Sequence, residues 1–202
     1  MTRIRKDRKL GRVTDADRVR RALERAASLH QRVAASQAEA VAKAAAVIRT
    51  ALDEGRHVLV FGNGGSATDA QHFAAELVGR FGIERRGLPV VALTADSAIL
   101  TSVANDYGFE SVFARQVEAL GRKGDVAIGI TTSGTSANVN RALRQARAAG
   151  LVTIGLTGRD GGETKDLVDV PVTVPGETSA EVQEVHRTLL HVMCDLIERP
   201  HA

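Results

Sequence analysis

Apolar and polar positions along this chain of 202 residues follow first a helical period and then an alternation of short apolar runs with amphipathic stretches. Residues 14–54 are rich in Ala, Arg, Glu and Gln, and their periodicity predicts two helices that are broken near His30 to Ala35. Apolar runs predict strands at 56–62, 89–94, 125–131, 151–156 and 169–174. The remaining amphipathic stretches predict helices at 66–80, 97–119, 136–149, 161–167 and 179–198.

Strands that alternate with helices and are apolar along nearly their whole length are typical of a parallel sheet covered on both faces. The prediction is an α/β fold in which helices flank a five-stranded parallel sheet, preceded by an N-terminal helical pair. With 44% hydrophobic and 25% charged residues, the chain fits one domain, expected over residues 13–202. We expect residues 1–12 to be a disordered, solvated tail because they carry Arg3, Arg5, Lys6, Arg8, Lys9 and Arg12.

Composition narrows the class of protein further. The formal net charge is +3, but much of the basic excess lies in the tail, and only 3% of the residues are aromatic, so base-stacking surfaces for nucleic acid are not expected. The single cysteine, Cys194, excludes an intramolecular disulfide and fits a reducing cytoplasm. No apolar run is long enough to span a bilayer. These features predict a cytoplasmic protein that binds neither nucleic acid nor a membrane.

Two glycine- and hydroxyl-rich turns each join a predicted strand to a helix. The first runs from Gly62 to Ser66 and the second from Thr131 to Ser136. Glycines let the backbone approach a ligand closely, and hydroxyls together with helix N-terminal amides suit a phosphate dianion. A plain tight turn explains the first cluster equally well, and Ser136 taken singly is a natural N-cap. Neither turn matches a dinucleotide fingerprint or a P-loop, so phosphate binding is predicted without a named ligand.

His72 and Glu76 are four residues apart on the helix that follows the first turn, which places both side chains on one face. Such a pair can ligate one metal ion or simply form an exposed ion pair. The last predicted helix adds Gln183, His186 and His191. Because Gln183 and His191 are eight residues apart, about 12 Å along a helix, helix geometry alone makes His186 the easier partner for Gln183.

These motifs, in this order, resemble the sugar isomerase (SIS) domain family and, within it, the phosphoheptose isomerases. The two turns carry the resemblance together with residues 104–109, 156–162 and 182–186 and with His191. The resemblance implies a flavodoxin-like 2-1-3-4-5 strand order, in which both turns border one pocket at the carboxyl edge of the sheet. It also implies a homo-oligomer, specifically a tetramer with sites between subunits.

The resemblance also implies a role for each candidate residue. The metal ligands would be His72, Glu76, Gln183 and His191, an N- and O-donor set that suits one zinc ion. Glu76 would be the general base and His191 the general acid, with His186 in the core or behind the ligands. Taken without the family, Asn105-Asp106 would be a local Asx turn. The expected substrate-binding residues are Asn63, Gly64, Gly65, Ser66, Glu76, Asn105, Asp106, Thr131, Thr132, Ser133, Ser136 and Gln183.

The implied reaction is the aldose–ketose isomerisation of sedoheptulose 7-phosphate to D-glycero-D-manno-heptose 7-phosphate through an enediolate, the first step of nucleotide-activated heptose biosynthesis. Two alternatives stay open. One is an isomerase of another phosphosugar, and the other is a non-catalytic SIS protein that binds a phosphosugar or the bacterial replication initiator. Glu76 and His191 favour an enzyme, because the relative that associates with the initiator does not keep them.

Overall fold

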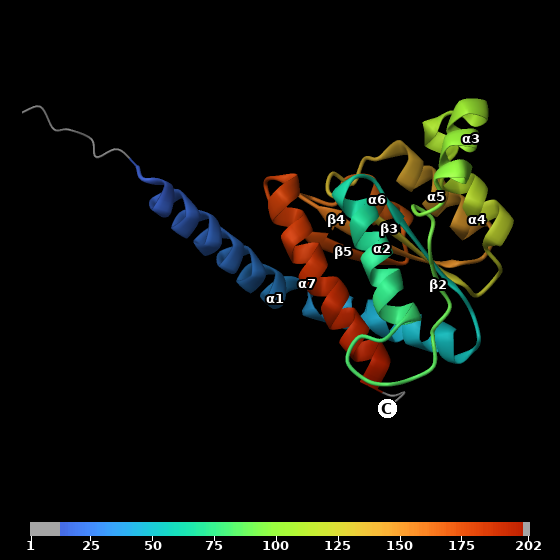
Figure 1. The fold of residues 1–202 in the computed structure, drawn as a ribbon, viewed down its shortest axis with the longest axis horizontal. Coiled ribbons are helices and arrows are strands. Elements are labelled where there is room, and N and C mark those ends of the chain that lie inside the picture. Colours follow the sequence, from blue (N-terminus) through green and yellow to red (C-terminus); the bar gives the residue numbers. More distant parts are fainter. Residues whose placement is uncertain (1–12, 200–202) are drawn as a thin grey trace, which may run out of the picture.

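The computed structural model describes residues 13–199, and its centre is a sheet of five parallel strands (Figure 1). Their order across the sheet is β2-β1-β3-β4-β5, and every neighbouring pair runs parallel. The predicted α/β class and flavodoxin-like strand order are therefore confirmed. The strands are β1 (Val58–Gly62), β2 (Val90–Ala92), β3 (Val126–Thr131), β4 (Val152–Gly158) and β5 (Val170–Val174).

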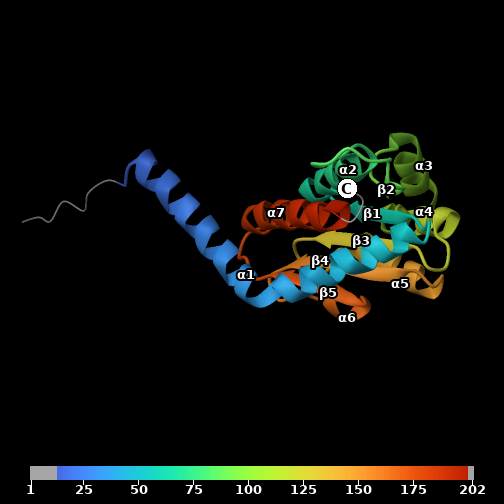
Figure 2. The ribbon, with the colours of Figure 1, turned by 90° about the horizontal axis from the view of Figure 1, so that it is seen from below.

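Successive residues of a central strand face two different hydrophobic clusters, which explains why the strands are apolar along their whole length. Val58 and Val60 of β1 pack with α1 (Asp15–Asp53), α2 (Gly65–Val78) and α7 (Ser179–Glu198). Leu59 and Phe61 pack on the opposite face with α4 (Ala114–Leu120) and α5 (Ala137–Ala148). Helices thus cover both faces of the sheet (Figure 2).

The predicted N-terminal helical pair is wrong, because α1 is one unbroken helix of 39 residues. A capping box between Thr14 and Asp17 begins it, and no Gly or Pro interrupts the sequence from Asp15 to Asp53. Figure 2 shows that the helix bends without breaking. The Ser36 hydroxyl donates to the Arg32 carbonyl oxygen at 2.9 Å, a bond of the kind that favours bending. The first half of α1 projects away from the sheet (Figure 1).

The helix predicted at 97–119 is also wrong as a single element. It consists of α3 (Ser97–Tyr107), a short 3-10 helix η1 (Phe109–Ser111) and α4. Gly108 separates the first two with a φ of 83°, which ends α3 at a conformation that other residues rarely adopt. Helix α6 (Thr164–Leu167) is shorter than predicted, since Gly161 and Gly162 also have positive φ angles.

The register of the sheet brings the two glycine- and hydroxyl-rich turns together. Gly62 at the end of β1 is the partner of Ile130 near the end of β3, so both turns leave neighbouring strands at the same edge. Over residues 13–199, no helix is both long and apolar enough to cross a membrane. The predicted basic tail at 1–12 lies outside the described residues.

Candidate active site

A reciprocal pair of amide hydrogen bonds joins the two turns. Asn63 Nδ2 donates to Asn138 Oδ1 at 2.8 Å, and Asn138 Nδ2 donates to Asn63 Oδ1 at 2.9 Å. Asn138 Oδ1 also accepts the N–H of Val139 at 2.9 Å. The turn after β1 is therefore fixed to the start of α5, and Asn63 is a link between loops as well as a predicted substrate ligand. Sequence reasoning missed Asn138, whose only signal was its place two residues after Ser136.

Hydroxyl groups gather at the start of α5. Thr131 Oγ1 lies 2.9 Å from Ser136 Oγ and 3.4 Å from Ser133 Oγ, and Ser133 Oγ accepts the N–H of Thr135 at 3.2 Å. Ser136 occupies the N-cap position, but its side chain makes no capping hydrogen bond. The capping explanation of Ser136 therefore fails, and the helix N-terminus with its clustered hydroxyls has the character of an anion site. Thr132, in the same turn, places its Oγ1 atom 3.0 Å from Oγ of Ser179 in α7.

The segment that follows β4 holds the hydroxyl turn in place through hydrogen bonds to Gly134. Thr164 donates to the carbonyl oxygen of Gly134 from both its backbone N–H and its hydroxyl, at 3.0 and 2.9 Å. Gly134 has a φ of 69°, and a Cβ there would collide with the backbone of Gly161. Asn140 Oδ1 lies 2.6 Å from the same Thr164 hydroxyl oxygen, and both side chains are buried. Sequence reasoning did not identify this support, because it depends on contacts across about thirty residues.

The first turn packs against the last helix. Gly64 takes a φ of 55° at the start of α2, and a Cβ on Gly65 would lie 2.5 Å from Gln183 Nε2. Gly65 therefore leaves room for the Gln183 side chain, which would have to move if this residue carried a Cβ. Ser66 is 3% exposed and closes the turn through its N–H, which donates to the Asn63 carbonyl oxygen at 3.0 Å.

His72, Glu76 and His191 converge between α2 and α7. The Nε2 atoms of the two histidines lie 2.7 Å apart, and His72 Nε2 lies 3.3 Å from Glu76 Oε1. One potential ligand atom from each residue lies within 4.8 Å of the others. The side chains of His72 and Glu76 are 30% and 24% exposed, so the group is open to solvent and substrate. Two imidazoles and a carboxylate that converge in this way form a donor set that could hold a divalent ion.

Gln183 packs against the glycine turn at the start of α2. Its side chain touches Gly65, which precedes His72 by two helical turns on α2, just as Gln183 precedes His191 by about two turns on α7. The two helices pack side by side. Three of the four predicted metal ligands thus come together, while Gln183 contacts the glycine turn, and its role as fourth ligand stays a prediction.

Local charges favour the metal-binding form of His72. Burial lowers the pKa of His72, the Arg187 charge lowers it further, and the Glu76 charge opposes the shift. The neutral imidazole, which ligates metals, is therefore the form at neutral pH. Arg187 pairs with Asp69 at 2.6 Å, and burial raises the pKa of that carboxyl. Sequence reasoning missed this pair, because Asp69 and Arg187 resemble ordinary surface charges until the helices are packed.

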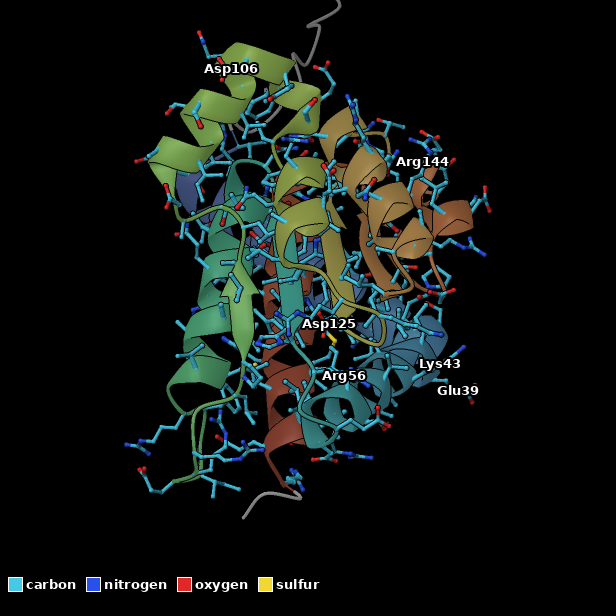
Figure 3. All side chains as sticks on the ribbon, turned by 90° about the vertical axis from the view of Figure 1, so that its right-hand side faces the viewer. Glu39, Lys43, Arg56, Asp106, Asp125 and Arg144 are labelled. Carbon is cyan, nitrogen blue, oxygen red and sulfur yellow. The ribbon has the colours of Figure 1, made fainter. Side chains whose placement is uncertain are left out.

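The remaining predicted residues lie in two different environments. His186 is fully buried, with Nε2 3.1 Å from the Thr157 carbonyl oxygen, which confirms its expected place in the core. Asn105 and Asp106 are exposed near the end of α3, a helix with no buried residue, and Asn105 Nδ2 donates to Asp106 Oδ1 at 2.9 Å. Asp106 lies at the outer end of α3 (Figure 3). Their contact with substrate stays a prediction.

Comparisons with known proteins agree with this geometry. The SIS domain family model matches residues 23–158. The phosphoheptose isomerase of Geotalea daltonii is 56% identical over 174 residues, covering 84% of this chain and 91% of that protein. The phosphoheptose isomerase of Aquifex aeolicus is 56% identical over 161 residues, covering 80% of this chain and 84% of that protein.

Solved structures give the same result. The phosphoheptose isomerase of Neisseria gonorrhoeae superposes with a TM-score of 0.88 at 43% identity, covering 92% of this chain and 100% of that chain. A phosphoheptose isomerase from Francisella tularensis superposes with a TM-score of 0.89 at 38% identity, covering 92% of this chain and 99% of that chain.

Proposed function

The chain belongs to the SIS domain family and, within it, to the phosphoheptose isomerases, and we propose that it converts sedoheptulose 7-phosphate to D-glycero-D-manno-heptose 7-phosphate. The observation that carries the proposal is the placement of two sites on one pair of helices. The hydroxyl turn, Thr131 to Ser136, contacts the first residue of α7, and the His72–Glu76–His191 group lies further along α2 and α7. A phosphosugar bound by its phosphate at the turn would direct its other end toward proton-transferring groups.

The phosphate would be bound by the second turn. Hydroxyls of Thr131, Ser133 and Ser136 and the free end of α5 would donate to it, with Thr132 and Ser66 at the rim. This arrangement needs no lysine, because hydroxyls and backbone amides supply the hydrogen bonds. Asn63, Gly64, Gly65 and Gln183 would orient the sugar chain, since the first turn is fixed to the second by the Asn63–Asn138 amide pair.

The chemistry would be a proton transfer between adjacent carbons. Glu76 would remove a proton from C1 of the ketose, the electron pair would form the enediolate, and Glu76 would return the proton to C2. His191 would take the proton from the C1 hydroxyl and deliver it to the C2 oxygen, so that the products balance as an aldehyde and an alcohol. His72, Glu76 and His191, with Gln183 as fourth ligand, would hold a divalent ion, zinc by its donor set, which when bound would supply Lewis-acid stabilisation of negative charge.

A heavy-water experiment tests this reaction directly. The enzyme incubated with sedoheptulose 7-phosphate in deuterium oxide should form the aldose and introduce deuterium at C1 of the ketose and C2 of the aldose, as followed by NMR. No product and no exchange would reject the assignment. Exchange with a different phosphosugar alone would identify another isomerase of the same class, and binding without any exchange would identify a phosphosugar-binding protein.

We also propose that the protein is a homo-oligomer, specifically a tetramer, in the cytoplasm. The projecting part of α1 exposes Val19 and Leu23, which are 60% and 67% exposed. An apolar groove between α1 and α7 is lined by residues such as Val33, Val41 and Val192. Packing against other copies would bury these residues and give Asn105 and Asp106 a route to a neighbouring site. A single buried, unpaired Cys194 supports a reducing compartment.

A further inference from the structure

The segment between α2 and β2, residues 79–89, has no regular structure, yet the end of α7 holds it firmly. It runs past the C-terminal end of α7 (Figure 1). Glu198, the last residue of α7, is 1% exposed and accepts the N–H groups of three successive residues of the segment. The distances from the Glu198 carboxylate are 3.0 Å to Phe81 N, 2.6 Å to Gly82 N and 2.9 Å to Ile83 N.

Arg85 completes the carboxylate's environment and binds the end of α2. Its Nε lies 3.1 Å from Glu198 Oε1, and the two side chains are 2% and 1% exposed. Arg85 Nη1 donates to the carbonyl oxygens of Leu77 and Gly79 at 2.8 and 3.0 Å. Arg85 Nη2 donates to the carbonyl oxygen of Glu76 at 3.0 Å. A cation from outside the helix thus satisfies carbonyl groups at the C-terminus of α2, where the sequence supplies no basic residue.

The same segment forms one wall of the His72–Glu76–His191 group. The Phe81 ring centroid lies 5.6 Å from that of His191, tilted by 37°. Phe81 also packs against the hydrophobic cluster between the sheet and α7. Since the Phe81 N–H is held by Glu198, the carboxylate fixes where the ring stands against the imidazole.

A buried ion pair is an unusual means of simple stabilisation. Removing two charges from water costs several kcal/mol, and well-packed apolar residues often stabilise a fold as well or better. The pair instead fixes the course of the backbone, because the carboxylate accepts three amide N–H groups and the guanidinium donates to four carbonyl oxygens. Burial would raise the pKa of Glu198, but the three amides and Arg85 hold it below its ordinary value, so the carboxylate stays charged at neutral pH.

We propose that Glu198 and Arg85 are positioning residues for the isomerase site. Arg85 fixes the backbone at Glu76, and Glu198 fixes Phe81 against His191, so that one buried ion pair sets the separation of the proposed base and acid. The inference rests on the proposed function. It assigns a catalytic consequence to two side chains that do not touch the substrate.

The central test compares Glu198→Gln with Asp125→Asn. Glu198→Gln keeps the shape of the side chain and removes its charge. Asp125 is the matched control: it is 1% exposed and accepts the N–H groups of His57 and Arg122 at 2.9 and 2.8 Å, but it precedes β3, at the opposite end of that strand from Thr131 (Figure 3). With sedoheptulose 7-phosphate, Glu198→Gln should lower kcat about ten- to a hundredfold while KM stays within about twofold, because the phosphate turn is intact. Asp125→Asn should lose stability without changing kcat.

A spectroscopic measurement distinguishes a displaced Phe81 ring from general unfolding of the Glu198→Gln protein. In protein with labelled histidines, the His191 ring signal carries a ring-current shift from Phe81, which Phe81→Leu should abolish. Glu198→Gln should move the His191 signal toward its position in Phe81→Leu. If Glu198→Gln fails to fold, Phe81→Leu, which keeps the ion pair and all its amides, should still lower kcat about tenfold.

Three results would overturn the proposal: a folded Glu198→Gln protein with unchanged kcat, an unmoved His191 signal in that protein, or full activity of Phe81→Leu. Failure of the wild type to isomerise sedoheptulose 7-phosphate would instead reject the proposed function. The His191 signal would still report, in that case, whether Glu198 positions Phe81.

Discussion

The Nε2 atoms of His72 and His191 lie 2.7 Å apart, although 119 positions separate the two residues along the chain. Two imidazole nitrogens at this distance can share one proton, whereas two protonated rings would repel each other. The Glu76 carboxylate lies 3.3 Å from the His72 nitrogen and adds a negative charge. The arrangement is therefore suited to a positive charge at its centre, either a shared proton or a metal ion.

We expect the protein to bind about one zinc ion per chain at this point. His191→Gln should weaken zinc binding at least tenfold, because it removes one of the imidazole ligands. Gln183→Ala in the same assay tests the fourth predicted ligand and should weaken binding as well. Calorimetric titration of the metal-free protein measures both effects, and His57→Gln, at a half-exposed histidine near the start of β1, is the control. Equal zinc affinity in the wild type and His191→Gln would contradict the site.

Removal of the metal should also lower stability. A ligand that binds only the folded state raises the free energy of unfolding with its concentration, so chelation should lower the melting temperature. It should also reduce turnover with sedoheptulose 7-phosphate. A fall in melting temperature with no loss of turnover would show that the ion is structural.

Glu76→Gln preserves size and polarity but removes the proposed base. Turnover should fall about a thousandfold or more, and phosphosugar binding should remain measurable. Deuterium exchange into the ketose provides the measurement. The control is Glu118→Gln, which removes an exposed carboxylate from the ion pair with Arg115 on α4. Exchange at the wild-type rate by Glu76→Gln would contradict the role of Glu76 as the general base, but it would not contradict the isomerase assignment.

The hydroxyl turn should determine substrate affinity. Ser133→Ala and Ser136→Ala each remove a donor to a charged phosphate, which is worth about 1.5–3 kcal/mol, so KM should rise roughly tenfold or more. Stability should change little in Ser136→Ala, because that hydroxyl does not cap α5. Ser102→Ala, whose hydroxyl bonds its own helix at Ile99, is the matched control. Unchanged KM values in both turn variants would place the phosphate elsewhere.

The buried His186 should make the fold sensitive to acid. Burial lowers the pKa of His186 to about 4, from an ordinary value of 6.5. The unfolded state then binds more protons than the folded state, so the stability from the neutral ring is complete above pH 6.5 and is lost as the pH falls toward 4. The expected slope over this window is at most about 1.4 kcal/mol per pH unit.

Urea unfolding of the metal-free protein at several pH values measures this slope. His186→Gln keeps a donor for the Thr157 carbonyl oxygen and should flatten the dependence between pH 6.5 and 4. His57→Gln serves again as the control and should retain the slope of the wild type. An unchanged slope in His186→Gln would assign the acid sensitivity to other groups.

The projecting half of α1 should hold the oligomer together. The chain mass is 21.4 kDa, and light scattering at micromolar concentration should give about four times this value for the wild type. Leu23→Lys places a charge at a side chain that is 67% exposed in the single chain and should dissociate the assembly. Leu120→Lys, at an apolar residue of α4 that is 49% exposed, is the control. A monomeric wild type would reject the prediction.

The sequence by itself determined the features that depend on local periodicity. Apolar runs determined the strands, because most residues buried on either face of a parallel sheet are apolar. The spacing of four residues determined that His72 and Glu76 share a helix face, which the 3.3 Å separation confirms. Gly134 could be recognised as part of a tight turn, but not as the residue that makes room for Gly161.

Tertiary structure alone decided which distant side chains meet. The Asn63–Asn138 amide pair, the His72–His191 contact and the Glu198–Arg85 ion pair join segments 75, 119 and 113 positions apart. No local pattern contains that information, since each partner taken alone resembles an ordinary polar residue. The unbroken form of α1, by contrast, agrees with its own sequence, since no Gly or Pro occurs across the expected break. The active-site groups could therefore be named from the chain, but their distances arise only when α2 and α7 pack side by side on the sheet.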